Sequence, residues 1–363
     1  MKDIRSLHAI RGYCALWVCF GHYHYLIDMI DIAFIKQIAR YGSLGIIIFF
    51  ILSGFFLAYV YNERFSTIRN IKKNYKKYII YRFGRIYPLY FVILAAFVIM
   101  SYLGWTAKTN VVINREFENP YYFPFYLLLI QCWGFLEGRE QYAFNSPSWT
   151  LSVDALLYII FPLIFFFILK IKNVFVNLSI IILVNIFYYV TVKDLGVMIN
   201  SEGEKQYFLA LFKNNPLEIV PVFIAGICIH SLYKQKFLSF LNWNLIIVIS
   251  IIVFYIMMYN DYRFNIILFI TPILVYGLLN ISEGFDKYFS NNIIYYIGTI
   301  AYSIYLWHIP YAVFVNHFFP LEDLDIWGWH FIPFIGGLFL LSSISYHLIE
   351  NPCRIWIKKN FTS

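Results

Sequence analysis

The chain is dominated by apolar segments about 20 residues long, which recur along almost its whole length. A helix of about 20 apolar residues is long enough to cross the hydrocarbon core of a bilayer. The segments lack the strict alternation of a barrel strand, so helices are the expected spanning element. The sequence predicts an all-α membrane protein with about ten transmembrane helices. These candidate segments are residues 7–27, 41–61, 86–104, 149–169, 174–193, 216–233, 243–260, 262–281, 293–318 and 330–350.

The composition excludes an ordinary soluble domain. Of the 363 residues, 61% are hydrophobic and only 13% are charged, whereas about a quarter of the residues in soluble domains are charged. The net charge of +8 does not indicate a nucleic-acid partner, because lysine and arginine collect in the cytoplasmic loops of membrane proteins. The five cysteines are odd in number and lack CxxC spacing, so we interpret them as apolar packing residues.

The distribution of charge predicts how the chain is oriented. The predicted loop 62–85 carries eight basic residues and a single acid, Glu63, so we expect it to be cytoplasmic. Both termini then face the cytoplasm. Segment 121–135 is short and contains Pro124, and we expect it to be re-entrant or interfacial, because counting it as a span would place later lysine pairs outside. No linker or repeat divides the chain, so residues 1–363 are expected to form one membrane domain.

Arg11 and His22 stand in the first apolar segment, eleven residues apart. At about 100° per residue this spacing returns to nearly the same helix face, about 16 Å along the axis, so we expect both to point into one cavity. The plainer interpretation is that Arg11 reaches the lipid headgroups and His22 satisfies itself on a backbone carbonyl. Ionisable side chains within a membrane are costly, however, and histidine titrates near neutrality, which suits a general base.

Asp154 lies about five residues inside a segment that enters from the outside, after a stretch rich in serine and proline. Its expected depth in the membrane matches that of His22, so the two side chains could meet. Asp154 would then act in catalysis by orienting His22 or stabilising its imidazolium. The alternative is that Asp154 is favoured only by the dipole of the helix N-terminus, behind a serine cap.

Arg82 and Arg85 are three residues apart where the basic region becomes the third apolar segment. Two neighbouring guanidinium groups can hold a phosphate bidentately. The alternative is that they only fix the cytoplasmic side. Together these groups suggest a conduit with a cationic cytoplasmic mouth and a histidine near the outer face. His308 is a second candidate, since Pro310 frees a backbone carbonyl nearby, although a structural role is preferred. No metal-ligand spacing such as HExxH is present, so no metal is expected.

Six sequence motifs resemble those of acyltransferase family 3, the integral-membrane O-acyltransferases of bacterial surface glycans. They are the arginine-x10-histidine pair at Arg11 and His22, GIIIFFILSGF at Gly45–Phe55, RFGRIYPLY at Arg82–Tyr90, SWTLSVD at Ser148–Asp154, YSIYLWHIP at Tyr302–Pro310 and SYHLIENP at Ser345–Pro352. The resemblance covers essentially the whole chain. Possible pocket residues within these motifs are Ser53, Ser148, Trp149, Ser152 and His308.

The resemblance implies an acyl-CoA donor, usually acetyl-CoA, with His22 as the essential histidine and Arg82 and Arg85 at the CoA phosphates. Arg11 is implied to belong to the same donor path. The family's usual glutamate is replaced here by Asp154, whose shorter side chain reaches less far. Many relatives carry a C-terminal hydrolase-like domain. We expect none here, so transfer should finish in the membrane domain or with a separate glycan-assembly partner.

The expected location is the bacterial inner membrane, among its lipids, and the expected acceptor is a polysaccharide or lipid-linked glycan. Direct attack by the acceptor hydroxyl and an acyl-histidine intermediate both remain open at this point. The sequence identifies neither the acceptor nor the acyl group. A glycan exporter is the main alternative, because it too would place ionisable residues along a membrane path.

Overall fold

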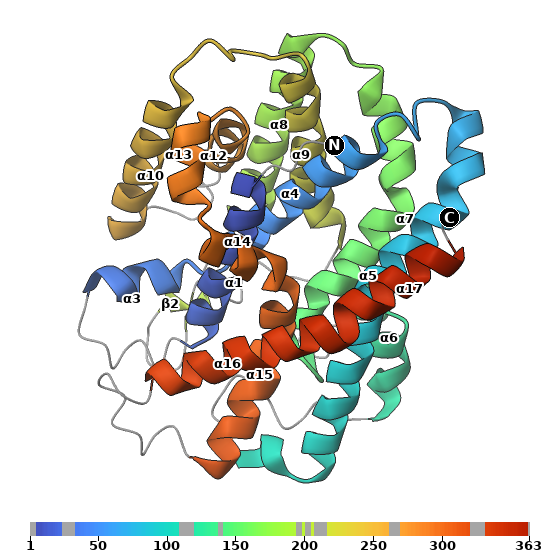
Figure 1. The fold of residues 1–363 in the computed structure, drawn as a ribbon, viewed down its shortest axis with the longest axis vertical. Helices are drawn as coiled ribbons and strands as arrows, with labels where there is room; N and C mark the ends of the chain where they lie inside the picture. The colour runs from blue at the N-terminus through green and yellow to red at the C-terminus, as the bar shows by residue number, and fades with distance from the viewer. Residues whose placement is uncertain are drawn as a thin grey trace.

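The computed structural model describes residues 5–23, 33–108, 120–136, 141–193, 198–199, 205–206, 216–260, 269–319 and 331–361. Nearly all of these residues are helical (Figure 1). The strands within these ranges are a single antiparallel pair of two residues each, β1 (Met198–Ile199) and β2 (Lys205–Gln206). The predicted all-α class is therefore confirmed for the described part of the chain.

The helices of the described ranges follow one another along the chain. In order they are α1 (Arg5–His22), α3 (Ala33–Arg40), α4 (Leu44–Tyr61), α5 (Ile68–Tyr102), α6 (Phe123–Leu127), α7 (Trp149–Leu169), α8 (Val174–Lys193), α9 (Pro216–Lys234), α10 (Trp243–Tyr259), α12 (Thr271–Leu278), α13 (Glu283–Phe289), α14 (Asn292–Thr299), α15 (Ala301–Phe318), α16 (Phe331–Ser345) and α17 (Asn351–Phe361). Short turns of 3₁₀ helix are η1 (Trp105–Lys108), η3 (Pro120–Tyr122) and η6 (Ser146–Ser148), and π turns are η4 (Gln131–Phe135) and η8 (Tyr346–Glu350).

Four helical stretches in the described ranges are long and apolar enough to cross a membrane: Leu44–Tyr61, Ile68–Tyr102, Ser146–Leu169 and Ile332–Phe361. Two shorter apolar helices cover Val174–Phe187 and Trp243–Tyr259. The predicted segment 293–318 is divided at Ile300 into α14 and α15, and residues 24–27, 262–268 and 330 of other predicted segments lie outside the described ranges. The count of about ten spans and the cytoplasmic side of both termini stay predictions.

The basic region before the third apolar segment was predicted to be a loop. From Ile68 onward it is instead part of a helix. Helix α5 begins at Ile68, where the Thr67 side chain accepts a hydrogen bond from the Asn70 amide, and it continues for 35 residues through Pro88 to Tyr102. At about 1.5 Å per residue this helix exceeds the roughly 30 Å hydrocarbon core of a bilayer. Its basic N-terminal turns therefore extend beyond the apolar layer. Arg82 and Arg85 follow about four turns in from the start of the same rigid helix.

Segment 121–135 forms short pieces rather than one continuous helix. Helix α6 has five residues, and the backbone then turns through left-handed conformations at Leu129 and Gly134, with φ of 57° and 89°. Hydrogen bonds from Tyr87 to the Leu127 carbonyl and from Tyr90 to the Tyr126 carbonyl tie the segment to α5.

Close contacts between helices depend on glycine. A β-carbon at Gly54 of α4 would collide with the Phe223 carbonyl of α9, and one at Gly298 of α14 would collide with the His8 carbonyl of α1. Small residues permit this approach in membrane helices. Helix α1 packs on α4, α14 and α15, while α16 and α17 form a long diagonal rod across the face seen in Figure 1. Arg11 and His22 are thus carried on a helix in the middle of the bundle.

Candidate active site

A cavity of about 410 Å³ opens between α1, α4, α5, α7, α15 and α17. This volume lies within the range of small-molecule sites. Four arginines and one carboxylate line it, together with aromatic and aliphatic side chains of α4. The charged residues are Arg11, Arg82, Arg85, Arg354 and Asp154. Four of these five come from the sequence prediction, and Arg354 was missed because it follows the last apolar segment.

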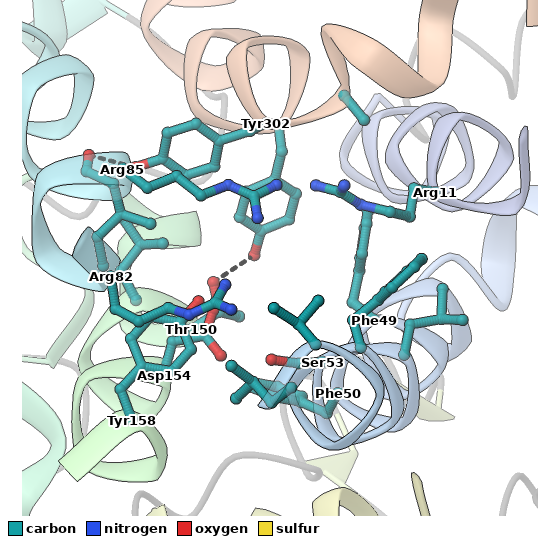
Figure 2. Close-up of a pocket in the computed structure, with 18 of the residues that line it drawn as sticks. Arg11, Phe49, Phe50, Ser53, Arg82, Arg85, Thr150, Asp154, Tyr158 and Tyr302 are labelled. Atoms are coloured by element: carbon teal, nitrogen blue, oxygen red, sulfur yellow. Dashed lines mark hydrogen bonds between the residues drawn. The ribbon is translucent and has the colours of Figure 1, made fainter. Parts of the chain in front are cut away.

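Arg11 and Arg85 face one another across this cavity, reaching inward from α1 and α5 (Figure 2). They are close enough to act electrostatically on each other as like charges. Such a pair is unfavourable in a low-dielectric interior unless negative charge is nearby. The cavity is therefore suited to an anionic group between them.

Arg82 is held in a cage of tyrosine rings at the edge of the cavity. It is 7% exposed, and its Cζ atom lies 5.0 Å from the centre of the Tyr61 ring and 5.9 Å from those of Tyr78 and Tyr158. The Arg82 Nε atom is buried and has no hydrogen-bond partner among the described residues. The rings stabilise the cation through their faces and leave its hydrogen-bond donors available.

Asp154 projects into the same cavity from α7, with Thr150 and Tyr158 one turn away on either side (Figure 2). Arg85, Arg82 and Arg11 all act electrostatically on its carboxylate. Its Oδ1 atom is buried and lacks a hydrogen-bond partner within the described ranges. Asp154 thus presents an unused acceptor beside cationic groups.

Glu350 is a second buried acid beside the cavity. It lies in the π turn η8, is 4% exposed, and acts electrostatically on Arg11 and Arg85. It partly compensates the arginine charge. Glu350 lies in the motif Ser345–Pro352 but was not among the predicted site residues. The signal that could have identified it is an acid inside the apolar segment 330–350.

His22 does not line this cavity. Its Nδ1 atom lies 2.9 Å from the Val18 carbonyl oxygen and 3.3 Å from Nε2 of His308. The predicted meeting of His22 with Asp154 is therefore not what the structure shows, because His22 is paired with His308 and Asp154 with the arginine cavity. The predicted topology gives their depth, but not the direction in which each side chain points around its helix.

Tyr305 connects the two regions. Its side chain lines the cavity, where its hydroxyl donates to the Pro147 carbonyl at 3.1 Å and accepts from Thr150 at 3.0 Å. Its backbone carbonyl accepts a hydrogen bond from His308 Nδ1. His22 and His308 thus lie immediately behind a wall of the cavity.

The remaining predicted pocket residues divide between the cavity and its supports. Ser53 lines the cavity, whereas Ser148 donates to the Asn145 carbonyl and forms no side-chain cap for α7. Ser152 accepts from the Cys132 amide, and Trp149 packs against Phe50. These three side chains support the start of α7 and the adjoining η4 turn. No cluster of three potential metal ligands occurs in the described ranges.

The sequence profile of a family described as an acyltransferase domain matches residues 4–347. The chain belongs to this acyltransferase family. Among its relatives are the peptidoglycan O-acetyltransferase OatA of Listeria monocytogenes, 24% identical over 87% of this chain, and the O-acetyltransferase OatA of Staphylococcus aureus, 25% identical over 88%. The matches cover 52% and 53% of these relatives, so the chain corresponds to about half of their length. No solved structure matches significantly. The family that the motifs indicated is therefore confirmed.

Proposed function

We propose that this acyltransferase moves an acyl group, in the first instance acetyl, from cytoplasmic acyl-CoA to a hydroxyl group of a bacterial surface glycan. The observation that carries this proposal is the arginine-lined cavity. Coenzyme A bears several phosphate groups, and guanidinium groups bind phosphate in a planar, bidentate geometry. Arg82 and Arg85 are assigned to these phosphates.

The opposite wall of the cavity suits the rest of the donor. It is formed by apolar side chains of α4, among them Phe49, Phe50 and Phe56. The pantetheine arm of CoA is a slender chain with two amide groups, which can lie along such a wall. We assign Asp154 Oδ1 as an acceptor for an amide N–H of the arm, since this buried oxygen has no hydrogen bond within the described structure.

The thioester end of the arm is proposed to reach His22. Arg11 and His22 lie eleven residues apart on α1, about 16 Å along the helix, which matches the extended length of the arm. His22 takes the proton of the acceptor hydroxyl as that oxygen attacks the thioester carbonyl. The C–S bond then breaks, and the CoA thiolate recovers the proton from the imidazolium. A placed general base contributes about 10²- to 10⁴-fold to rate.

The acceptor is proposed to be a glycan at the outer face of the inner membrane. The Listeria relative bears the name peptidoglycan O-acetyltransferase, which makes muramyl glycans the first acceptors to test. Lipid-linked glycan and surface polysaccharide present hydroxyl groups of the same chemistry. Glycan-assembly proteins are the expected partners.

The experiment is transfer of label from [¹⁴C]acetyl-CoA to glycan by the purified protein in nanodiscs. Wild type is expected to form alkali-labile ester on the glycan, and His22→Ala to bind acetyl-CoA but form none. A matched control is His230→Ala, because His230 of α9 is also buried but packs on Phe55 of α4 and does not line the cavity. Transfer by His22→Ala at the wild-type rate would exclude His22 as the base.

A further inference from the structure

His22 and His308 form a buried pair whose hydrogen bonds define the tautomer of each ring. His308 is fully buried and His22 is 4% exposed. The His308 Nδ1 atom lies 2.5 Å from the Tyr305 carbonyl oxygen, and its Nε2 atom lies 3.3 Å from His22 Nδ1. The ring centres are 4.9 Å apart.

A carbonyl oxygen only accepts hydrogen bonds, so these contacts assign the protons. His308 Nδ1 carries the hydrogen that Tyr305 accepts, and His308 Nε2 is left with a lone pair. His22 Nδ1 must also carry hydrogen, because it lies 2.9 Å from the Val18 carbonyl. That N–H therefore faces two acceptors, the Val18 oxygen and His308 Nε2. The remaining nitrogen of His22, Nε2, holds the lone pair.

We propose that His308 is a positioning residue that holds His22 in the tautomer whose Nε2 atom accepts the proton of the glycan hydroxyl. This inference rests on the proposed function. When Nε2 takes the proton, the His22 imidazolium still donates from Nδ1 to His308 and Val18, and His308 neither gains nor loses a proton. The acceptor oxygen attacks the thioester carbonyl, the C–S bond breaks, and the thiolate takes the proton back.

The surroundings keep His308 in this orientation. The Tyr23 hydroxyl donates to the His308 carbonyl oxygen, and Tyr305 holds the Nδ1 side of the ring. Pro310 has no amide hydrogen to give to the Leu306 carbonyl, and the Asn145 side chain donates to that oxygen at 3.3 Å instead. The carbonyl freed by the proline is thus satisfied without His308, whose ring nitrogens stay with Tyr305 and His22.

The first test compares His308→Leu with His308→Gln in the labelled transfer assay. Leucine has about the volume of histidine but no acceptor, whereas the glutamine side chain can place an oxygen near the Nε2 position. His308→Leu is expected to lower kcat about 10²-fold with KM for acetyl-CoA unchanged, because the donor cavity lies apart from the pair. His308→Gln is expected to recover kcat to within about 10-fold of wild type.

The second test reads the tautomer in the intact wild-type protein, so it does not depend on a variant that folds. Solid-state NMR of [¹⁵N]histidine-labelled protein in lipid is expected to show protonated Nδ1 and unprotonated Nε2 for His22, assigned by the signal lost in His22→Gln. His22 protonated on Nε2 alone would overturn the inference. A wild-type kcat in His308→Leu, together with no activity in His22→Ala, would also overturn the inference. Activity in His22→Ala would instead overturn the proposed function.

Discussion

Ser303 of α15 donates a hydrogen bond of 3.1 Å to the Glu350 carboxylate, and both residues are buried. This bond joins α15 to the η8 turn behind the arginine cavity. Glu350 adds negative charge beside Arg11 and Arg85, on which the Asp154 carboxylate also acts. The arginine site therefore depends on an acid that does not line the cavity itself.

Glu350→Ala is expected to destabilise the protein by about 3 kcal/mol, because removing one partner leaves buried charge uncompensated. Ser303→Ala is expected to cost about 1 kcal/mol, the value of one hydrogen bond. Thermal unfolding in detergent measures both effects. Glu63→Ala, at an exposed acid, is the control. An unfolding temperature for Glu350→Ala equal to that of the control would contradict the compensating role.

Gly298→Ala is expected to lower stability by about 1–3 kcal/mol and to reduce acyl transfer, because its β-carbon would push α14 away from the His8 carbonyl of α1. Helix α1, against which α14 packs, carries Arg11 and His22. Gly336→Ala in α16 is the matched control, since a β-carbon there meets no atom within 4 Å. Alanine has a higher helix propensity than glycine, so this control substitution should be neutral or stabilising. Equal effects at the two sites would show that close α1–α14 contact is not needed.

Arg82→Lys is expected to weaken acetyl-CoA binding about 10-fold even though the positive charge is kept. The flat guanidinium lies over several tyrosine rings and can offer two donors to one phosphate, whereas an ammonium is a point charge. Tyr61→Phe should bind as wild type because the ring face remains, and Tyr61→Leu should not. Equal dissociation constants for Arg82→Lys and wild type would argue against bidentate binding by this residue.

Asp154→Ala is expected to raise KM for acetyl-CoA about 3- to 10-fold, the value of one hydrogen bond, with a smaller effect on kcat. Asp154→Asn removes the same charge but keeps an acceptor oxygen, so its KM should stay near wild type. Steady-state kinetics over a range of acetyl-CoA concentrations separates the two variants. Loss of kcat in both, with KM unchanged, would assign Asp154 to the chemical step instead.

The sequence was most informative where an ionisable side chain occurs in or beside an apolar segment. Arg11, Arg82, Arg85 and Asp154 are ionisable residues in or beside apolar segments, and all four line one cavity. Ionisable side chains are energetically unfavourable in a membrane, and for this reason the four residues could be selected from the sequence. Glu350 satisfied the same criterion and could have been found by applying it along the whole chain.

Pairwise contacts were not predictable in the same way. Equal depth suggested that His22 would meet Asp154, but the rotation of each helix about its axis decides which side chains face one another. That rotation depends on close approaches such as Gly298 against His8, which no local pattern encodes. The division of α14 from α15 at Ile300 could not be predicted from hydropathy either, because apolar residues continue across the break.

Acyl-CoA is proposed to bind in the arginine cavity. The most direct measurement is the dissociation constant of acetyl-CoA for the double variant Arg82→Gln and Arg85→Gln. Its control is the double variant Arg64→Gln and Arg69→Gln, at exposed arginines that do not line the cavity. Charged hydrogen bonds contribute about 1.5–3 kcal/mol each, so the cavity variant is expected to bind at least about 100-fold more weakly than wild type, and the control within about 3-fold. Equal affinity in the two double variants would contradict the account.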